Sequence, residues 1–458
     1  MKRLFALFLI LATLFLYACA PTATPPAGGD GPTDPPAGET PPPEDDPAND
    51  IPETPPTYGA EGIFAGSETS IPILRINTAG SAPIVSREEY LSAAVSMTGK
   101  WSFSGVSATV RGRGNSTWEY FEKKSYRLKF DKRYDLMGMG AAKDFVLNAC
   151  PMDISLMQNY AALKLAVAIG SDYAPECGFV QLYVNGSYEG LYLLSERIEE
   201  DRERVDIGDG KSGAVDVGYL VEFGGNVDWR GKPFFRMQPV EVDGSLYEWR
   251  YNFFGVVKSP DEEVCNQAQL NYISNYVNRV NEAILRGDFD TFTSLCDLDS
   301  FVDYVLVNQL FLNNDMDFSL YMYKEAGGKL KLGPVWDFDQ ACGNSIKAGN
   351  GYEGWRVNEH ISWVSALMEM PKFREHFLNK WIECYPTISA MPADIAAKAK
   401  HMEKAIARNY DRWQVIGQPY WRITEEAAAF TTYEQFLSRL TKWFENRIAW
   451  IDKQLGFE

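Results

Sequence analysis

The chain has 458 residues and carries 44 Lys and Arg against 62 Asp and Glu, which gives a formal net charge of −18. A chain this acidic argues against a nucleic-acid partner, because the phosphate backbone is bound by basic surfaces. The three histidines are His360, His376 and His401, and none lies near an evident serine nucleophile motif, so the sequence disfavours histidine-based hydrolysis.

The first residues have the pattern of an export signal. Lys2 and Arg3 precede an almost wholly apolar run, and Leu16-Tyr17-Ala18-Cys19 follows it. This predicts a secretory signal over residues 1–18. The end of the run resembles a bacterial lipobox, which implies that Cys19 is lipidated and anchors an exported protein to the outer face of a bacterial membrane. An ordinary signal peptide or an uncleaved anchor are the alternatives.

Residues 19–57 are rich in Pro, Gly, Thr, Asp and Glu and predict a disordered linker, because they cannot bury enough apolar surface to fold. Residues 58–458 remain for a folded domain. Six cysteines follow Cys19 without a C-x-x-C spacing, so they predict no zinc site and permit either disulfides or free thiols.

Strand signals dominate the first part of this domain. Residues 108–111 and 125–130 read as two strands joined through a Gly-rich bend. A helix is expected over 153–169, with Asp153 as its N-cap. A hairpin follows at 179–194, because Asn185-Gly186 suits a type I′ turn, and one more strand is expected at 218–223.

Helical signals dominate after residue 258. Ser259-Pro260-Asp261-Glu262 has the pattern of a capping box and predicts a helix to about residue 285. A second helix is expected over 299–312, and a hairpin turns at 325–328. The domain is therefore predicted to be α+β, with a β-rich part at 65–258 and a helical part at 259–458.

The Gly-rich bend is a candidate anion site. Arg111, Arg113 and Asn115 lie among its glycines, and Lys123 and Lys124 follow closely. Glycines allow the backbone to approach a ligand, and arginines bind anions with paired donors. In so acidic a chain this basic cluster suits a polyphosphate. A charged hairpin tip is the alternative.

Two aspartate pairs, Asp315-Met-Asp317 and Asp337-Phe-Asp339, are the candidate metal site. In an extended segment, residues i and i+2 face the same way, so each pair aims two carboxylates together while Trp336 and Phe338 turn into apolar packing. A divalent cation offsets the repulsion between such carboxylates. Cations on the bend and carboxylates for Mg²⁺ together suit phosphoryl transfer. A solvated acidic turn is the alternative.

Five segments share the pattern of one known family. They are Arg111-Gly-Arg-Gly-Asn-Ser-Thr-Trp118, Lys123-Lys-Ser-Tyr-Arg-Leu-Lys-Phe130, Ser155-Leu-Met-Gln-Asn159, Asn185 to Glu196, and Gly333-Pro-Val-Trp-Asp-Phe-Asp339 with Gly343. In this order they closely resemble the CotH spore-coat kinase family over roughly residues 65–450. The resemblance implies an atypical bilobal protein-kinase-like fold that binds ATP with Mg²⁺, in a family where some members phosphorylate serine in secreted or coat proteins.

The resemblance also implies roles for individual residues. Asp337 is expected to hold the metal and Asp339 to add a second ligand. Either Asp315 or Asp317 is expected to orient the acceptor hydroxyl, and the sequence does not choose between them.

For the nucleotide, the resemblance makes Lys124 the expected phosphate-binding lysine, supported by Arg111, Arg113, Asn115 and Ser116. Glu196 is the possible substitute for the glutamate that pairs with this lysine in ordinary kinases.

These observations predict ATP- and Mg²⁺-dependent phosphoryl transfer to a serine of a secreted or surface protein. Two alternatives stay open. One is a non-catalytic scaffold with a kinase-like fold, because the chain has no His-Arg-Asp catalytic loop. The other is a carbohydrate-binding surface lipoprotein, because 12 Trp and 24 Tyr could stack on sugars.

Overall fold

The computed structural model describes residues 71–208, 210–224, 229–248, 254–316, 320–346, 351–356 and 363–457. Residues 1–46 and 47–458 form two units, of which only the second contains described residues. The predicted signal, the lipidation site Cys19, the linker and the candidate acid Asp317 all lie outside the described residues. In the part of the chain that is described, no helix combines the length and apolar character needed to cross a bilayer.

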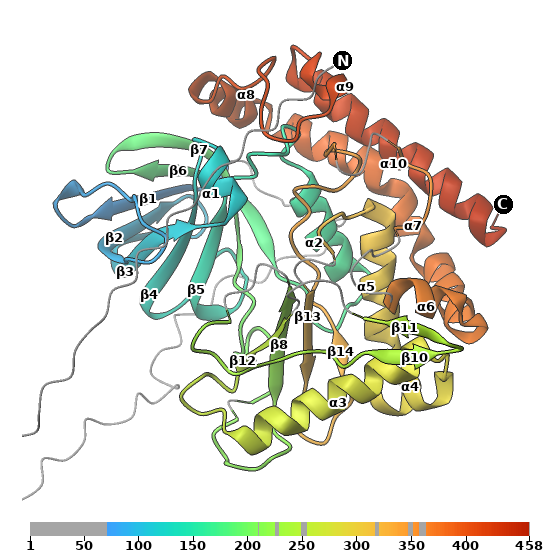
Figure 1. The fold of residues 1–458 in the computed structure, drawn as a ribbon. Helices are drawn as coiled ribbons and strands as arrows, with labels where there is room; N and C mark the ends of the chain where they lie inside the picture. Colours follow the sequence, from blue (N-terminus) through green and yellow to red (C-terminus); the bar gives the residue numbers. More distant parts are fainter. Residues whose placement is uncertain are drawn as a thin grey trace, which may run out of the picture. The chain divides into compact units, whose positions relative to one another are not determined.

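Seven strands of the first half close into a barrel (Figure 1). Neighbouring strands pair antiparallel, except that β1 and β6 pair parallel and so complete the closure. Apolar side chains on alternate positions fill the interior, as the period of two predicts. In barrel order the strands are β1 (Ile73–Thr78), β2 (Leu91–Thr98), β3 (Phe103–Arg113), β4 (Ser125–Asp135), β5 (Ala141–Asn148), β7 (Ser187–Glu196) and β6 (Cys177–Val184).

All three predicted hairpins are confirmed, two in the barrel and one between the strands that flank the turn at 325–328. β3 pairs with β4, and Arg113 lies opposite Ser125 at the open end of the bend. β6 and β7 are joined by Asn185 (φ 50°) and Gly186 (φ 82°), the two positive φ angles that a type I′ turn requires. The bend itself contains a short helix, α1 (Ser116–Tyr120), which the sequence did not predict.

A second sheet of five strands joins residues from both parts of the domain. Its central strand, Tyr219–Gly224, pairs on one side with the strand Phe254–Ser259 and on the other with the strand Leu320–Lys324. The strand order is β14 (Lys331–Leu332), β13 (Leu320–Lys324), β8 (Tyr219–Gly224), β12 (Phe254–Ser259) and β9 (Phe234–Phe235), and β10 (Val240–Val242) with β11 (Ser245–Tyr247) forms a separate hairpin. The α+β class is therefore confirmed. The expected bilobal, kinase-like division is not, because the strands form a closed barrel and this shared sheet.

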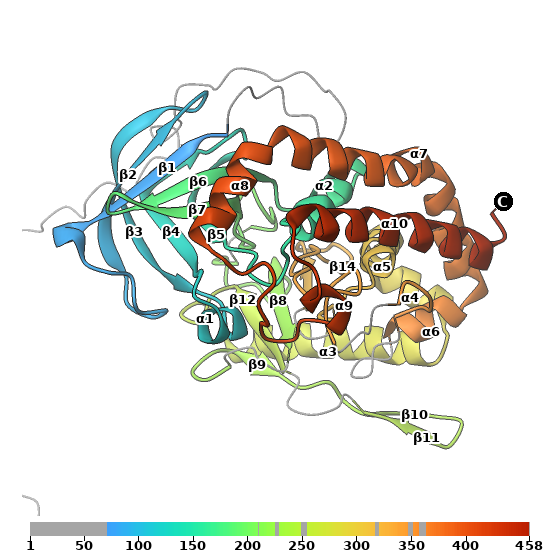
Figure 2. The ribbon, with the colours of Figure 1, turned by 90° about the horizontal axis from the view of Figure 1, so that it is seen from above.

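The helices pack around α5, whose residues 300–311 are all buried. α5 contacts α2, α7 and α10, and the long helices α7 and α10 lie side by side (Figure 2). In chain order the structure has η2 (Ala79–Ser81), α2 (Gln158–Ala168), α3 (Gln267–Leu285), α4 (Phe289–Leu295), α5 (Leu298–Phe311), α6 (Trp363–Glu369), α7 (Pro371–His401), α8 (Glu403–Arg412), α9 (Glu425–Ala428) and α10 (Tyr433–Leu455).

Two predicted helix starts are wrong. The capping box that begins α3 uses Asn266 and Gln269, because Ser259 still belongs to β12 and pairs with Leu220. α2 begins at Gln158, but the carboxylate of Asp153 accepts a hydrogen bond from the Gln158 amide at 2.8 Å. The N-cap is therefore Met157 and not Asp153, whose carboxylate reaches the first amide of the helix across an intervening loop.

Candidate functional site

The Gly-rich bend folds back on itself because two of its glycines leave no room for a side chain. A Cβ at Gly112 would lie 2.2 Å from the Trp118 ring and 2.9 Å from the Ser86 carbonyl oxygen, which accepts a hydrogen bond from the Gly112 amide at 2.7 Å. Gly114 has φ +105°, a conformation that other residues rarely adopt. With glycine at these two positions the bend is tight, and its polar residues 115–117 face the same cavity.

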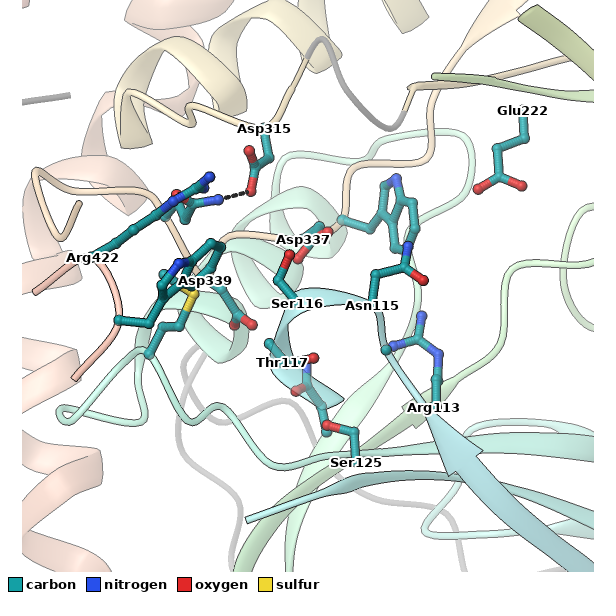
Figure 3. Close-up of a pocket in the computed structure, with 16 residues that line it drawn as sticks. Arg113, Asn115, Ser116, Thr117, Ser125, Glu222, Asp315, Asp337, Asp339 and Arg422 are labelled. Carbon is teal, nitrogen blue, oxygen red and sulfur yellow. Dashed lines mark hydrogen bonds between the residues drawn. The ribbon is translucent and has the colours of Figure 1, made fainter. Parts of the chain in front are cut away.

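Those residues line a cavity of about 320 Å³. Figure 3 shows the side chains of the bend and three carboxylates, Asp315, Asp337 and Asp339, around one space. The cavity thus brings together the two motifs that the sequence singled out, although they are far apart in the chain. Trp421 and Arg422, which the sequence analysis did not single out, complete the wall.

A second cavity of about 230 Å³ adjoins the first. The two cavities share Arg113, Asn148, Glu222, Trp336 and Asp337. Asp337 therefore faces space on both sides. Together the cavities form a continuous polar cleft between the end of the barrel and the second sheet.

The loop at Asp337 differs from the extended segment that the sequence predicted. Asp337 has φ 61°, in the left-handed region, so the alternation of faces breaks at this residue. Phe338 is buried against Phe311, with ring centroids 5.2 Å apart, as predicted. Trp336 packs in part against the buried Tyr321, with ring centroids 5.4 Å apart, and also lines both cavities, with the Arg113 guanidinium 5.9 Å from its ring centroid.

The carboxylates of the cleft repel each other. Burial raises the pKa of Asp337 to about 8, and the charges of Asp339 and Asp315 add to this rise while Arg113 opposes it. Burial also raises the pKa of Asp339 to about 6, against the hydrogen bond from Asn159. Such mutual destabilisation is what a bound cation would relieve.

Asn159, on α2, holds the loop of Asp337 and Asp339 in place. Its side-chain amide donates to Asp339 Oδ1 at 2.5 Å, and its side-chain oxygen accepts from the Phe338 amide at 2.9 Å. The sequence analysis did not assign Asn159 to the site. Its position in the segment 155–159 of the family pattern was the available signal.

A chain of polar side chains also fixes Asp315. Its carboxylate accepts from Gln340 Nε2 at 2.5 Å, and Gln340 Oε1 accepts from Arg422 Nη1 at 2.7 Å. Asp315 therefore lies in the cleft, where the sequence expected an acid. Neither Gln340 nor Arg422 was predicted.

The bend supplies cations and polar groups unequally. Arg113 lines both cavities, and burial lowers the pKa of its guanidinium against the opposing charge of Asp337. Arg111 lines only the second cavity, donates to the Arg87 and Gly112 carbonyls and lies over the Tyr90 ring. Asn115 and Ser116 line the first cavity as expected, and Asn115 Oδ1 accepts from Arg87 Nη1 at 3.0 Å.

The expected pair of Lys124 with Glu196 is not formed. Lys124 Nζ donates to the Trp118 carbonyl and does not line either cavity of the cleft. Glu196 lines the second cavity but accepts from Arg204 at 2.6 Å and from the Tyr173 hydroxyl at 3.0 Å. Arg204 thus takes the place that the analogy gave to a lysine.

The donor set of the cleft is suited to Mg²⁺. Asp337 and Asp339 offer carboxylate oxygens, and Mg²⁺ commonly takes one or two carboxylates and completes its shell with water and phosphate oxygens. Among the described residues, no three acidic, histidine or cysteine side chains are close enough to enclose a metal alone.

Comparison with known proteins adds one finding. The family model described as CotH kinase protein matches residues 110–451. The chain belongs to the CotH family. The match contains every cleft residue named above from the bend to Arg422, so this CotH chain carries its cleft wholly within the family region. No curated protein matches the chain.

The cysteines of the described residues, including five buried ones, are free thiols.

Proposed function

We propose that this CotH chain transfers a phosphoryl group from ATP to a serine hydroxyl of a secreted or surface protein. One observation carries the proposal: Arg113 and the polar bend face Asp315, Asp337 and Asp339 across one cavity. Phosphoryl transfer depends on positioning and on neutralising charge, and this cleft offers groups for both.

The bend is the proposed phosphate site. Arg113 presents guanidinium donors, and Asn115, Ser116 and Thr117 add amide and hydroxyl donors in the same cavity. Asp337 and Asp339 would hold Mg²⁺, which neutralises phosphate charge when it is bound. Asn159 keeps Asp339 oriented toward that position.

Asp315 is the proposed acid that orients the acceptor hydroxyl and accepts its proton. Its carboxylate accepts a hydrogen bond from Gln340, and Asp315 lines the same cavity as Asp337 and Asp339. Asp317 remains the alternative acid. The predicted export signal and the predicted lipidation of Cys19 support an acceptor outside the cytoplasm, with the enzyme tethered to a membrane.

Transfer of labelled phosphate from ATP to a serine-containing acceptor protein tests the proposal. Asp337→Asn should lower the rate by about 10³-fold, since it removes a charge that acts at the transferring group. Asp290→Asn is the matched control, because Asp290 is an exposed acid on α4 with a partner at Lys372, and its rate should equal that of the parent. Equal transfer by the parent and Asp337→Asn would reject the kinase.

A non-catalytic scaffold is the second candidate, and one observation favours it. Glu196 is bound to Arg204 and Lys124 to the Trp118 carbonyl, so the lysine–glutamate pair that the analogy predicted is not formed. A scaffold that has lost its ligand would show no thermal stabilisation by ATP with Mg²⁺. Under the kinase proposal, ligand at about 100 times its Kd should stabilise the fold by about 2.7 kcal/mol.

A further inference from the structure

Lys123, the other lysine of the basic cluster, lies outside the phosphate cleft. Its side chain is only 7 % exposed. The ammonium donates to the Leu191 carbonyl at 2.6 Å and lies 4.7 Å from the centroid of the Tyr192 ring. The proposed phosphate chemistry therefore does not use this cation.

Lys123 lines a separate cavity of about 440 Å³ with aromatic walls. One wall comes from the end of α1, where Tyr120 stacks on Trp421 with ring centroids 4.8 Å apart. The opposite wall comes from α8 and the segment after it, with Tyr410 and Trp413. A cavity of this size with apolar walls and few polar groups suits a small organic ligand.

Lys123 lines this cavity together with Asn409 and Trp413. The position that a Cβ on Gly190 would take is 3.2 Å from Lys123 Cε, 2.6 Å from Asn409 Oδ1 and 3.0 Å from Trp413 Nε1. The end of the Lys123 side chain therefore lies close to two polar groups of the lining.

This cation has no acidic partner among the described residues. Glu122 lines the same cavity but is exposed at its rim and forms no ion pair with Lys123 in the described part of the chain. By contrast, the buried Lys324 pairs with Asp216 at 2.6 Å. Burial lowers the pKa of Lys123 to about 7, against a smaller effect of Cys150. A buried ammonium without an acidic partner is costly, and an anion brought by a ligand would offset that cost.

We propose that this cavity binds an organic acid with an apolar body, whose carboxylate meets Lys123 Nζ while its body lies between the aromatic walls. The charge of Lys123 favours the carboxylate of such a ligand, and the aromatic walls favour its apolar body. The site is distinct from the phosphate cleft, although Trp421 lines both. The proposal does not rest on the kinase activity.

Isothermal titration calorimetry with 3-phenylpropionate and its uncharged amide tests the site on the full chain. The acid should bind at least about 10-fold more tightly than the amide, since a hydrogen bond to a charged group is worth about 1.5–3 kcal/mol. Lys123→Met should abolish this preference. Lys124→Met is the matched control, because Lys124 is the neighbouring lysine outside this cavity, and it should keep the preference.

Equal affinity for the acid and the amide, or binding of neither, would overturn the proposal, and both results come from the parent chain without any variant. Lys123→Arg keeps the positive charge and should retain part of the preference if Lys123→Met loses its fold. Preference for the acid in a folded Lys123→Met chain would place the anion site elsewhere and also overturn the assignment.

Discussion

Asp337 places the acids of the cleft through a single backbone conformation. Its left-handed φ of 61° turns Phe338 into the core and leaves Trp336 at the cavity. Asp is one of the residues that tolerates this region, since its short polar side chain can bond locally. This backbone conformation therefore lets Phe338 pack in the core while the neighbouring Asp337 lines the cavity.

Gly112 is the residue on which the shape of the bend depends most directly. Gly112→Ala should lower the free energy of unfolding by roughly 1–3 kcal/mol, because its Cβ would overlap the Trp118 ring and the Ser86 carbonyl. Urea denaturation followed by circular dichroism measures the change. Gly351→Ala is the control, since a Cβ there meets nothing within 4 Å, and it should unfold like the parent. Equal stability of both variants would mean that the bend relaxes without cost.

The residue types of the site could be predicted from the sequence better than their partners. The aspartates, Arg113 and the polar bend meet as expected, because their chemistry is visible in the motifs. Lys124 was assigned to the phosphate wrongly, since both lysines lie in the irregular segment before β4 and the sequence does not show which side chain of such a segment meets a cavity. Gln340 and Arg422 were missed because only the tertiary fold brings them to Asp315.

At the scale of elements, α10 is joined to α5 through one buried arginine. Arg447 is fully buried and donates to the Gln309 carbonyl at 2.7 Å and to the Tyr352 and Gly354 carbonyls at 2.8 and 2.6 Å. Burial lowers the pKa of Arg447 to about 9. The guanidinium therefore connects two helices and the segment 351–356 at the back of the core.

Arg447→Met should reduce the free energy of unfolding by about 2 kcal/mol, because it removes these bonds and leaves the buried Gln309 carbonyl with fewer donors. Lys442→Met on the same helix is the control, since Lys442 is exposed and pairs with the exposed Glu445. Its effect should stay within about 0.5 kcal/mol. Chemical denaturation measures the free energy of unfolding of both variants. Similar small decreases for Arg447→Met and Lys442→Met would show that apolar packing alone holds α10 in place.

Elements with strong local signals were predicted well, and those that depend on distant partners were not. The Asn185-Gly186 hairpin and α5 follow from turn chemistry and from apolar periodicity. The start of α3 was wrong because the backbone of Ser259 is used by β12, and nothing in the local sequence shows that pairing. The short helix α1 has too few residues to show a period.

At the scale of the whole molecule, the fold depends on pairings between distant strands. The parallel contact of β1 with β6 closes the barrel, and β8 pairs with both β12 and β13 in the second sheet. Strand and helix composition gives the α+β class, but no sequence period reveals which strands meet across such separations. The cleft lies where these two sheets approach, so its existence could be expected from the motifs but its geometry could not.

Lys123 also gives the whole molecule a dependence of stability on pH. Its pKa is about 7 in the folded chain against an ordinary 10.5, so between these values the unfolded chain binds a proton that the folded chain does not. The free energy of unfolding should therefore rise with pH in this window, by up to about 1.4 kcal/mol per unit from this group. The facing Cys150 and Tyr192 stay neutral there, since burial raises the pKa of both.

Urea denaturation at pH 7, 8, 9 and 10 isolates this effect when the parent is compared with Lys123→Met. The stability of the parent relative to Lys123→Met should increase steadily with pH, because the variant has no ammonium to discharge on folding. Lys124→Met should follow the parent at every pH, since that lysine lies outside the aromatic cavity. If the difference in free energy of unfolding between the parent and Lys123→Met stays constant from pH 7 to 10, Lys123 keeps its proton in the folded chain. The ammonium would then be stabilised by a group other than those that line the cavity.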